Sequence, residues 1–227
     1  MSTPRRPTLY SGPLSMFGAK VQIAAREKGI DFDLVMVPFD FHRLYAPRHP
    51  EVLRINPKRQ VPVLVDGDVE LFDSTQIFEF LEDLRPEPPL WPRQRVDRAR
   101  ARLLEHQSDE VYFPFIIRLM GLQDDLQGAP AREAIEGALA WSRRMEDLLA
   151  GRDWLAGSYT FADIAFYMAS FFGERLGAPW PAEFTRLHAW RARMTQRPAV
   201  REVIGAMARW LHANGRPLPA FVQPLLE

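Results

Sequence analysis

The sequence contains no cysteine, carries no formal net charge and has no long hydrophobic run. The lack of cysteine excludes disulfides, thiolate metal sites and any cysteine nucleophile or redox couple. Because 29 acidic residues balance 29 basic ones, no broad electrostatic attraction to nucleic acid or to an anionic membrane is expected. The longest nearly apolar stretch, 161–172, contains Asp163 and is shorter than the roughly 18 residues of a membrane-spanning helix. These absences favour small-molecule or protein partners, with no nucleic acid and no membrane.

The N-terminus shows no targeting signal. Two arginines lie within residues 1–7, but no apolar segment that resembles a secretory signal follows them, so a cytoplasmic location is expected. The length of 227 residues, 47% of them hydrophobic, suits one large domain or two small ones. A proline-rich break at 86–92 favours two. We therefore predict domains at 1–84 and 94–227, joined by a linker at 85–93.

The first 84 residues contain alternating strand and helix patterns. Asp66-Gly67 separates two short β-type runs and is a strong signal for a tight hairpin turn. Gly29 stands where a left-handed helix C-cap is expected. This region is predicted to form a four-stranded mixed sheet with helices on both faces. The predicted elements are strands at 8–10, 32–37, 61–65 and 69–72, helices at 17–28 and 73–84, and a loop at 38–55 with room for one short helix.

The remaining residues have helical periodicity and no convincing strand. Pro114 lies inside the first predicted helix and should kink it or end it one turn early. Thr160 and Asp163 have the spacing of a reciprocal N-terminal cap. The tail, which contains three prolines, is predicted to be extended or irregular. The fold class is therefore α+β, with an all-α C-terminal domain of predicted helices at 96–122, 131–149, 161–175, 183–196 and 199–212.

Two features of the first domain predict a site for an extended peptide. Pro62 cannot donate to a strand ladder, so the backbone of Val61 is left free to pair with something other than protein. Asp73-Ser74 brings a carboxylate, a hydroxyl and free backbone N–H groups to one helix N-terminus. The absence of cysteine means that any thiol chemistry at this site uses a thiol of the ligand.

Several short motifs follow one another along nearly the whole chain: Leu9-Tyr10, Ser15 ahead of Lys20-Val21, Asn56-Pro57, Gln60-Val61-Pro62, Asp73-Ser74, Trp154-Leu155-Ala156-Gly157 and Thr160-Phe161-Ala162-Asp163. In order and spacing, these motifs resemble the cytosolic glutathione transferases, which join a thioredoxin-like N-terminal domain to an all-helical one. The resemblance is to the serine-dependent, theta- and zeta-like bacterial type, although the serine-rich turn with a cysteine that marks the zeta class is absent. It implies glutathione as co-substrate, a homodimer, a role in detoxification and no metal.

The catalyst of this family must convert the glutathione thiol, which titrates near ~8.5 when unperturbed, into a thiolate. Ser15, at a helix N-terminus, can donate its O–H to the sulfur while the helix dipole adds positive potential. The alternative is that Ser15 is simply an N-cap, a role in which serine is common. Ser11 is a second candidate donor, whereas Tyr10 lies on the opposite face of the strand and is expected to be a core aromatic.

The resemblance also implies how glutathione is held. The Val61 backbone pairs with the cysteinyl residue beside a cis Val61–Pro62 bond, with an ordinary trans proline as the alternative. Ser74 receives the γ-glutamyl carboxylate and Asp73 the ammonium, although a capping box from Asp73 to Gln76 explains both residues equally well. The glutathione-binding set is Ser15, Phe17, His42, Gln60, Val61, Pro62, Asp73 and Ser74, with Gln60, His42 and Arg43 near the glycyl carboxylate.

The second substrate is expected between the domains, on apolar residues of the kinked helix and the C-terminal region. The alternative is that this apolar stripe is core. The predicted function is a glutathione S-transferase that attacks a small hydrophobic electrophile by addition or substitution. A zeta-like isomerase that returns its glutathione, and a glutathione- or partner-binding module without turnover, remain alternatives. The predicted second-substrate residues are Tyr112, Phe115, Ile116, Leu119 and Trp210.

Overall fold

The computed structural model describes residues 6–46 and 48–226; residues 1–5, which fall in the predicted first domain, and residues 47 and 227 lie outside it. A four-stranded sheet has the order β2-β1-β3-β4, with β1 parallel to β2 and antiparallel to β3. This is the predicted mixed sheet. The predicted third strand began two residues early, because Val61 and Pro62 precede the ladder. The strands are β1 (Thr8–Ser11), β2 (Asp33–Met36), β3 (Val63–Asp66) and β4 (Val69–Phe72).

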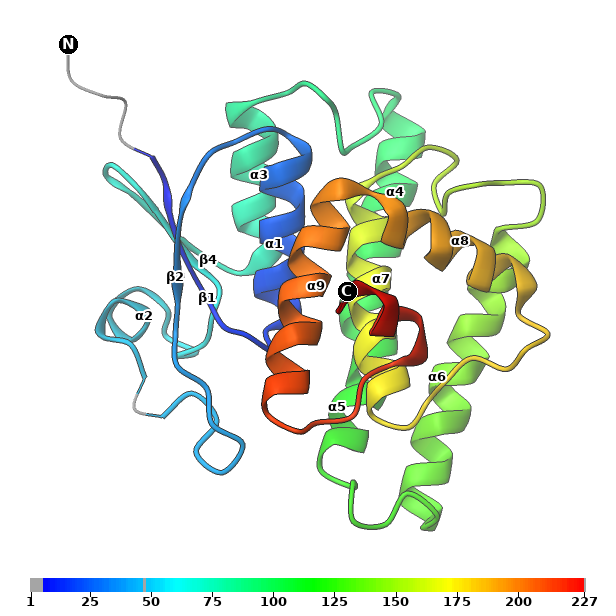
Figure 1. Cartoon of the computed structure of the whole chain (residues 1–227). Coiled ribbons are helices and arrows are strands. Elements are labelled where there is room, and N and C mark those ends of the chain that lie inside the picture. The colour runs from blue at the N-terminus through cyan, green and yellow to red at the C-terminus, as the bar shows by residue number, and fades with distance from the viewer. Residues whose placement is uncertain (1–5, 47, 227) are drawn as a thin grey trace.

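Helices cover both faces of this sheet (Figure 1). α1 (Met16–Glu27) and α3 (Ser74–Leu84) lie between the sheet and the helical region, and α2 (Pro50–Ile55) lies on the other face. Gly29 ends α1 with φ of 62°, and Gly67 turns the β3–β4 hairpin with φ of 60°. Both glycines therefore occupy the left-handed conformation that the sequence predicts.

The rest of the described chain is helical. α7 is its centre, since residues 161–173 are all buried, and Figure 1 shows the other helices around it. Asp163 at its start accepts from the Thr160 N–H, the Leu155 N–H and the Trp190 indole, which confirms the predicted cap. Burial nevertheless raises the pKa of Asp163 to about 6. The helices are α4 (Arg95–Gln107), α5 (Phe113–Met120), α6 (Ala129–Leu148), α7 (Phe161–Arg175), α8 (Thr185–Gln196) and α9 (Pro198–Ala213).

The predicted helix at 96–122 is interrupted next to its proline. A π-helical segment, η1 (Ser108–Tyr112), joins α4 to α5, and Pro114 lies in the first turn of α5. Proline removes a backbone donor and its ring needs room in the preceding turn, so a widened turn at this point is the expected response. The predicted interruption of this helix is confirmed, and the extra residue in the π-helical turn rotates the helix face presented after it relative to a continuous α-helix.

The prediction of an extended or irregular tail is wrong in part. A 3₁₀ helix, η2 (Ala220–Leu225), follows Pro219 and contains Pro224. Val222 and Leu225 are buried against the helical core. Their burial, which local proline content does not reveal, explains why this segment is ordered into a turn of helix.

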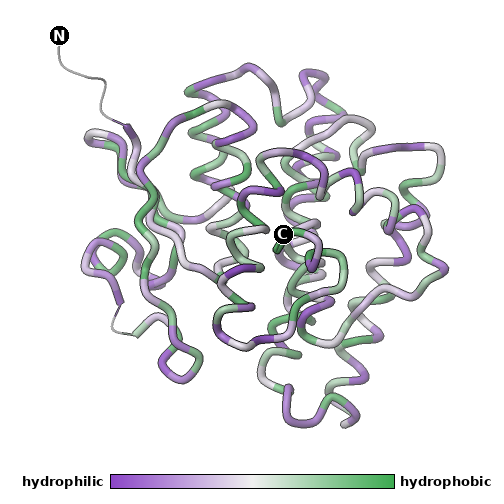
Figure 2. Tube along the Cα trace, in the orientation of Figure 1, coloured by the Kyte–Doolittle hydropathy of each residue, from purple (hydrophilic) through white to green (hydrophobic). Residues whose placement is uncertain are grey.

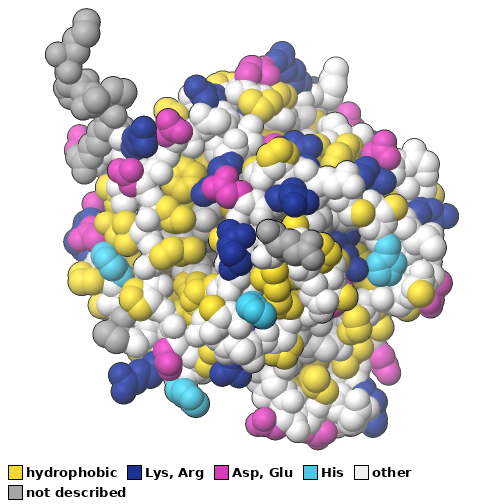
Figure 3. Space-filling model, viewed as in Figure 1, with side chains coloured by type: hydrophobic (Ala, Val, Ile, Leu, Met, Phe, Trp, Pro, Cys, Tyr) yellow, Lys and Arg dark blue, Asp and Glu magenta, His cyan; other side chains and the backbone are white. Residues whose placement is uncertain are grey.

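Hydrophobic and polar residues are distributed as expected for a helical domain packed on a sheet (Figure 2). On the face seen in Figure 3, acidic and basic side chains are interspersed and hydrophobic ones gather over β2 and the loop after it. Leu34 and Met36 of β2 are 36% and 44% exposed. Within residues 6–46 and 48–226, no helix is both long and apolar enough to cross a bilayer.

Candidate functional site

A cleft runs between the sheet domain and the α4–α5 region, in two adjoining halves. We call the cavity of about 400 Å³ beside α3, α4 and η1 the acidic half. The cavity of about 330 Å³ beside the start of α1 and α5 is the apolar half. Phe17, Gln60 and Val61 line both. The two halves are therefore one continuous site with contrasting chemistry at its ends.

The turn before β3 presents Val61 to this junction. The buried Asn56 side chain donates to the Gln60 carbonyl at 2.6 Å and accepts from the Lys58 N–H at 2.9 Å. These bonds hold the turn rigid through side-chain and backbone partners. The Val61–Pro62 bond is cis, which confirms the prediction for this peptide. Val61 lies outside the strand ladder and lines both halves, so its backbone is not used in the sheet.

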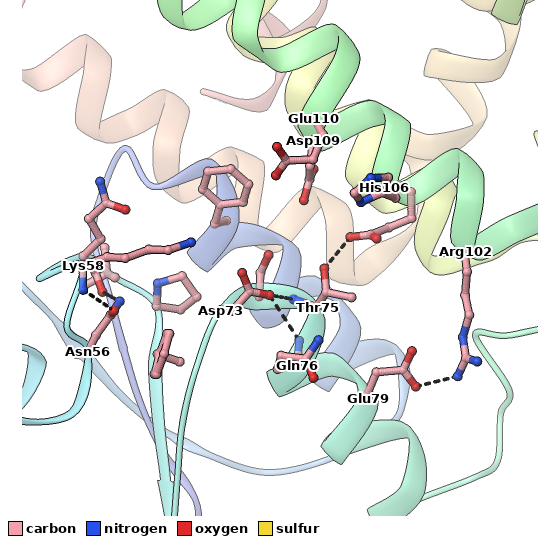
Figure 4. Close-up of a pocket in the computed structure, with 17 residues that line it drawn as sticks. Asn56, Lys58, Asp73, Thr75, Gln76, Glu79, Arg102, His106, Asp109 and Glu110 are labelled. Atoms are coloured by element: carbon pink, nitrogen blue, oxygen red, sulfur yellow. Dashed lines mark hydrogen bonds and ion pairs between the residues drawn. The ribbon is translucent and has the colours of Figure 1, made fainter.

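The start of α3 forms the floor of the acidic half (Figure 4). Asp73 has φ of 76°, a conformation that a non-glycine residue rarely adopts and that recurs at functional sites. Its carboxylate accepts from the N–H groups of Thr75 and Gln76, which is the Asp73 half of the capping box predicted as the alternative. The Ser74 N–H is not among the groups it caps, and Ser74 itself is buried at the first helical position. One helix-start amide is thus left to face a ligand anion.

A buried ion cluster lies behind the same half. The Lys20 ammonium of α1 is fully buried and donates to Glu105 at 2.8 Å and to Asp109 at 2.5 Å. Thr75 of α3 also donates to Glu105, at 2.7 Å. Burial opposes the charge on Lys20, but Asp109 and Glu105 together raise its pKa above the ordinary value. The cluster therefore ties the sheet domain to α4 and η1 with a lysine that stays charged.

Asp109 is the unusual member of this cluster. One of its carboxylate oxygens, Oδ1, is buried without a hydrogen-bond partner among the described residues. Burial raises the pKa of Asp109 to about 6, against the attraction of Lys20 and with help from the neighbouring Glu105. Figure 4 shows Asp109 and Glu110 projecting from the helix that faces the start of α3. The acidic half thus holds negative charge that is not fully neutralised, where a ligand cation is favoured.

Ser15 marks the other end of the site, at the start of α1. Its side-chain oxygen accepts from the Gly18 N–H at 2.9 Å, so it is the N-cap of the helix. It also lines the apolar half. A hydroxyl that accepts from a backbone N–H keeps its own proton, so capping leaves the Ser15 O–H available to a ligand.

Comparison with known proteins identifies the family to which this fold belongs. Residues 9–89 match the family description "Glutathione S-transferase, N-terminal domain" and residues 124–198 match "Glutathione S-transferase, C-terminal domain". Glutathione S-transferase 1 of Dianthus caryophyllus is 33% identical over 71% of this chain and 72% of that protein. The chain belongs to the glutathione S-transferase family.

Relatives and solved structures within this family carry different names. FtsZ-localized protein A of Caulobacter vibrioides is 30% identical over 89% of this chain and 92% of that protein. A stringent starvation protein A homologue of Coxiella burnetii is 38% identical, but the match spans only 47% of this chain and 48% of that protein. A glutathione transferase structure from Burkholderia graminis, with two glutathione molecules bound per one protein subunit, has a TM-score of 0.74 and 25% identity, covering 91% of this chain and 89% of that one.

Two residues predicted for the glutathione S-transferase site lie away from the cleft. Ser11 is fully buried, and its hydroxyl accepts from the Gln22 side chain at 3.0 Å, so it cannot reach a ligand as the second donor. His42 is exposed but lines neither half, whereas the neighbouring Arg43 lines the apolar half. Tyr10 packs on the ring of His49, with centroids 4.9 Å apart, as expected of a core aromatic. The other predicted glutathione-binding residues line one or both halves: Ser15, Phe17, Gln60, Val61, Pro62, Asp73 and Ser74.

The predicted second-substrate residues mostly belong to the core. Tyr112, Ile116 and Leu119 are at most 1% exposed. The ring of Phe115 occupies the space over Gly137 of α6. Trp210, a residue of α9, packs on Phe39 and Phe41. The residues of this region that line the apolar half are instead Phe113, Ile117 and Met120. Two features explain why the lining residues differ from the predicted ones. The π-helical segment rotates the face of α5, and the predicted residues pack against α6 and α7 in the core.

No local sequence pattern pointed to Tyr45, which also lines the apolar half. Its ring packs over Gly12, where a side chain would collide with it. Its hydroxyl is buried with no hydrogen-bond partner among the residues that the structure describes, and burial raises its pKa well above the ordinary value. Tyr45 lies in the loop after β2, so only the fold brings it to the β1–α1 turn. Among the described residues, no group of His, Asp and Glu side chains is arranged to hold a metal ion.

Proposed function

We propose that this protein binds glutathione along the cleft and activates its thiol for attack on an apolar electrophile. The observation that carries the proposal is the order of groups along one continuous site. At one end of the site lie the Ser74 N–H, which Asp73 does not cap, and the carboxylates of the acidic half. The backbone of Val61 lies in the middle, and the Ser15 hydroxyl lies at the other end. Glutathione offers a carboxylate and an ammonium, a peptide, and a thiol in the same order.

The γ-glutamyl end fits the acidic half. Its carboxylate is placed at the Ser74 N–H and hydroxyl, at the positive end of α3. Its ammonium is placed among the carboxylates, where Asp109 supplies charge that Lys20 does not neutralise. The cysteinyl residue then pairs with the Val61 backbone as a one-residue strand addition. This arrangement directs the thiol toward Ser15.

Ser15 lowers the pKa of the thiol by donating its O–H to the sulfur anion, aided by the dipole of α1. The thiolate attacks an electrophilic carbon, a carbon–sulfur bond forms, and a leaving group such as halide departs with its bonding electrons. No step requires a cysteine of the protein. The apolar half, with Phe113, Ile117 and Met120, receives the electrophile and excludes water from the reaction.

The direct test is the ionisation of bound glutathione. We expect thiolate absorbance to appear at a pH at least about one unit below the free value of ~8.5, together with conjugation of chlorodinitrobenzene by the purified protein. Unchanged ionisation in a saturated complex, with no turnover of halides, epoxides, enones or peroxides, would refute the transferase proposal.

A second prediction concerns Asp109 and pH. Its pKa is raised to about 6 in the ligand-free protein, and only the ionised form attracts an ammonium. Affinity for S-methylglutathione, which has no thiol to titrate, should therefore increase as pH rises from about 5 to 8. In Asp109→Asn the affinity at pH about 8 should be roughly tenfold lower, and the increase with pH should be lost.

Calorimetric titrations across this pH range measure the effect. His106→Gln is the matched control, because His106 lines the same half but takes part in neither ion pair of the buried cluster. The other charged residues around Asp109 stay unchanged in both variants, so they cannot account for a difference between them. These residues are Lys20, Glu105, Glu110 and Asp73. A pH dependence that vanishes in His106→Gln but persists in Asp109→Asn would contradict the assignment.

A binding module without turnover is the second candidate function. It is favoured by the similarity over 89% of the chain to a protein named for its localisation by FtsZ. In that case the protein would bind glutathione or a protein partner, and thiol ionisation would be unchanged. The ultraviolet titration separates the two candidates, because it reads the state of the thiol without requiring the right electrophile.

A homodimer and a cytoplasmic location are further proposals that follow from the family resemblance. Leu103 and Val111 are 54% and 42% exposed on α4 and η1, which suits a subunit interface. Sedimentation equilibrium tests the dimer. A single species of about 26 kDa at micromolar concentration would contradict it.

A further inference from the structure

β2 is an edge strand of the sheet, and its outer side is open. Within the described residues it pairs with β1 alone. The N–H groups of Asp33 and Val37 donate to the carbonyls of residues 7 and 11, at 2.8 and 2.7 Å. Because successive residues of a strand direct their backbone groups to opposite sides, the N–H and C=O groups of Leu34 and Met36 point away from β1. Two pairs of backbone groups are therefore open to another strand.

The side chains of β2 leave this edge unprotected. Edge strands are commonly blunted by lysine or proline, and β2, with the sequence Asp-Leu-Val-Met, contains neither. Leu34 and Met36 are 36% and 44% exposed, and hydrophobic side chains gather over β2 in Figure 3. An open apolar edge of this kind is a template for an added strand.

A cavity of about 310 Å³ opens at the end of β2, between this strand and α9. Of its lining residues, Val37 alone also lines the cleft, and none carries a charge. The cavity lies on the face of the sheet to which Met36 points, so it has room for an apolar side chain of a strand laid along β2. The apolar residues around it include Met36, Val37, Pro38, Phe39, Met207 and Trp210.

A carboxylate lies at the other end of β2. Asp33 is exposed and takes part in no ion pair within the part of the chain that the structure describes. By contrast, Glu202 of the neighbouring α9 pairs with Arg26 at 2.7 Å. At about 3.3 Å per residue, Asp33 and Met36 are roughly 10 Å apart along the strand. An added strand with an apolar residue opposite Met36 thus meets negative charge three residues away.

We propose that the β2 edge binds an extended peptide segment of another protein by strand addition, antiparallel to β2. The peptide exchanges backbone hydrogen bonds with Met36 and Leu34, and the apolar side chain opposite Met36 enters the cavity. A lysine or arginine three residues later pairs with Asp33. The partner sequence is therefore an apolar residue, any residue, an apolar residue and a basic residue. The site requires no glutathione, so it does not depend on the transferase reaction.

The backbone pairing can be tested with labelled peptides. We would titrate fluorescein-labelled Ser-Phe-Thr-Val-Arg-Ser with the full chain and follow fluorescence anisotropy, expecting saturable binding. N-methylation of the phenylalanine and valine removes the two N–H groups that donate to Met36 and Leu34, and it should weaken binding at least about tenfold. N-methylation of the threonine, whose N–H faces solvent in this register, is the matched control and should change the affinity by less than about threefold.

The cavity and the charge are tested by substitutions at exposed positions. Ala206→Trp fills the cavity from α9, where Ala206 is exposed, and should weaken binding at least about tenfold. Asp33→Lys should weaken binding about fivefold, and a peptide with glutamate in place of arginine should recover it. Asp68→Lys makes the same charge change at the exposed β3–β4 turn and should have no effect.

Three results would overturn strand addition at this edge. The first is the absence of saturable binding. The second is equal affinity for the unmodified and both N-methylated peptides, which would indicate apolar adsorption. The third is a dimer that dissociates in Met36→Pro while no peptide binds, which would assign the edge to a second copy of this chain. Met36→Pro suits this purpose because the Met36 N–H is not directed toward β1.

Discussion

Ser15→Ala is expected to lower kcat/KM for conjugation by about 10- to 100-fold, because it removes a hydrogen bond to an anion that contributes about 1.5–3 kcal/mol. The pKa of the bound thiol should rise by about one to two units for the same reason. Affinity for S-methylglutathione, which has no thiolate to stabilise, should change by less than about threefold. Steady-state kinetics, ultraviolet titration of the complex and calorimetry measure the three quantities.

Capping must be separated from thiolate stabilisation in this experiment, because Ser15 also accepts from the Gly18 N–H. Loss of an N-cap costs about 1 kcal/mol of stability. Ser15→Asp retains a capping oxygen but has no O–H to donate, so it should be folded and as inactive as Ser15→Ala. Ser15→Thr retains both functions and should recover most of the activity. Equal activity in Ser15→Asp and wild type would show that the serine only caps α1.

The second large effect is expected in the ion cluster, where Lys20→Met should destabilise the protein by about 3–5 kcal/mol. Methionine is similar in length, but it leaves the buried carboxylates of Glu105 and Asp109 facing each other without a cation. Urea unfolding at neutral pH measures the loss. Lys58→Met is the matched control, since Lys58 is exposed, and it should change stability by less than about 0.5 kcal/mol.

The pH dependence of this loss distinguishes an electrostatic cause from a packing defect. The pKa of Asp109 is about 6 in the folded protein, above its ordinary value of 3.8, so the folded state binds a proton that the unfolded state releases. Ionised Asp109 therefore weakens folding as pH rises through about 6, and more so without Lys20. We expect the difference between wild type and Lys20→Met to be larger at pH about 8 than at pH about 5. A difference that is constant across this range would indicate a packing defect instead.

Local sequence signals predicted the elements well because each depends on residues close together in the chain. Asp66-Gly67 identified the hairpin and Gly29 the end of α1, since both glycines need positive φ. Thr160 and Asp163, three residues apart, identified the start of α7. Pro114 identified the interruption between α4 and α5. The predicted domain division at 85–93 rests on the same kind of signal and remains a prediction.

Periodicity was a poor guide to which apolar side chains line the cleft. Tyr112, Ile116 and Leu119 fit a helical stripe, and the structure buries them against the other helices. The residues of α5 that line the apolar half of the cleft include Ile117 and Met120, which are exposed. A hydrophobic stripe reports what the fold buries and not what a ligand covers.

The sequence by itself determined the strands, the helices and their caps, the presentation of Val61 before β3, and a serine at the start of α1. These features follow from turn chemistry, backbone donors and side-chain spacing within a few residues. Only the tertiary structure decided that Ser15 and not Ser11 opens on the cleft, and that Tyr45 and two arginines of one loop lie beside it. It alone brought Lys20 to Glu105 and Asp109, 85 and 89 residues away. Contacts over such separations arise from packing around a shared core, which no local pattern encodes.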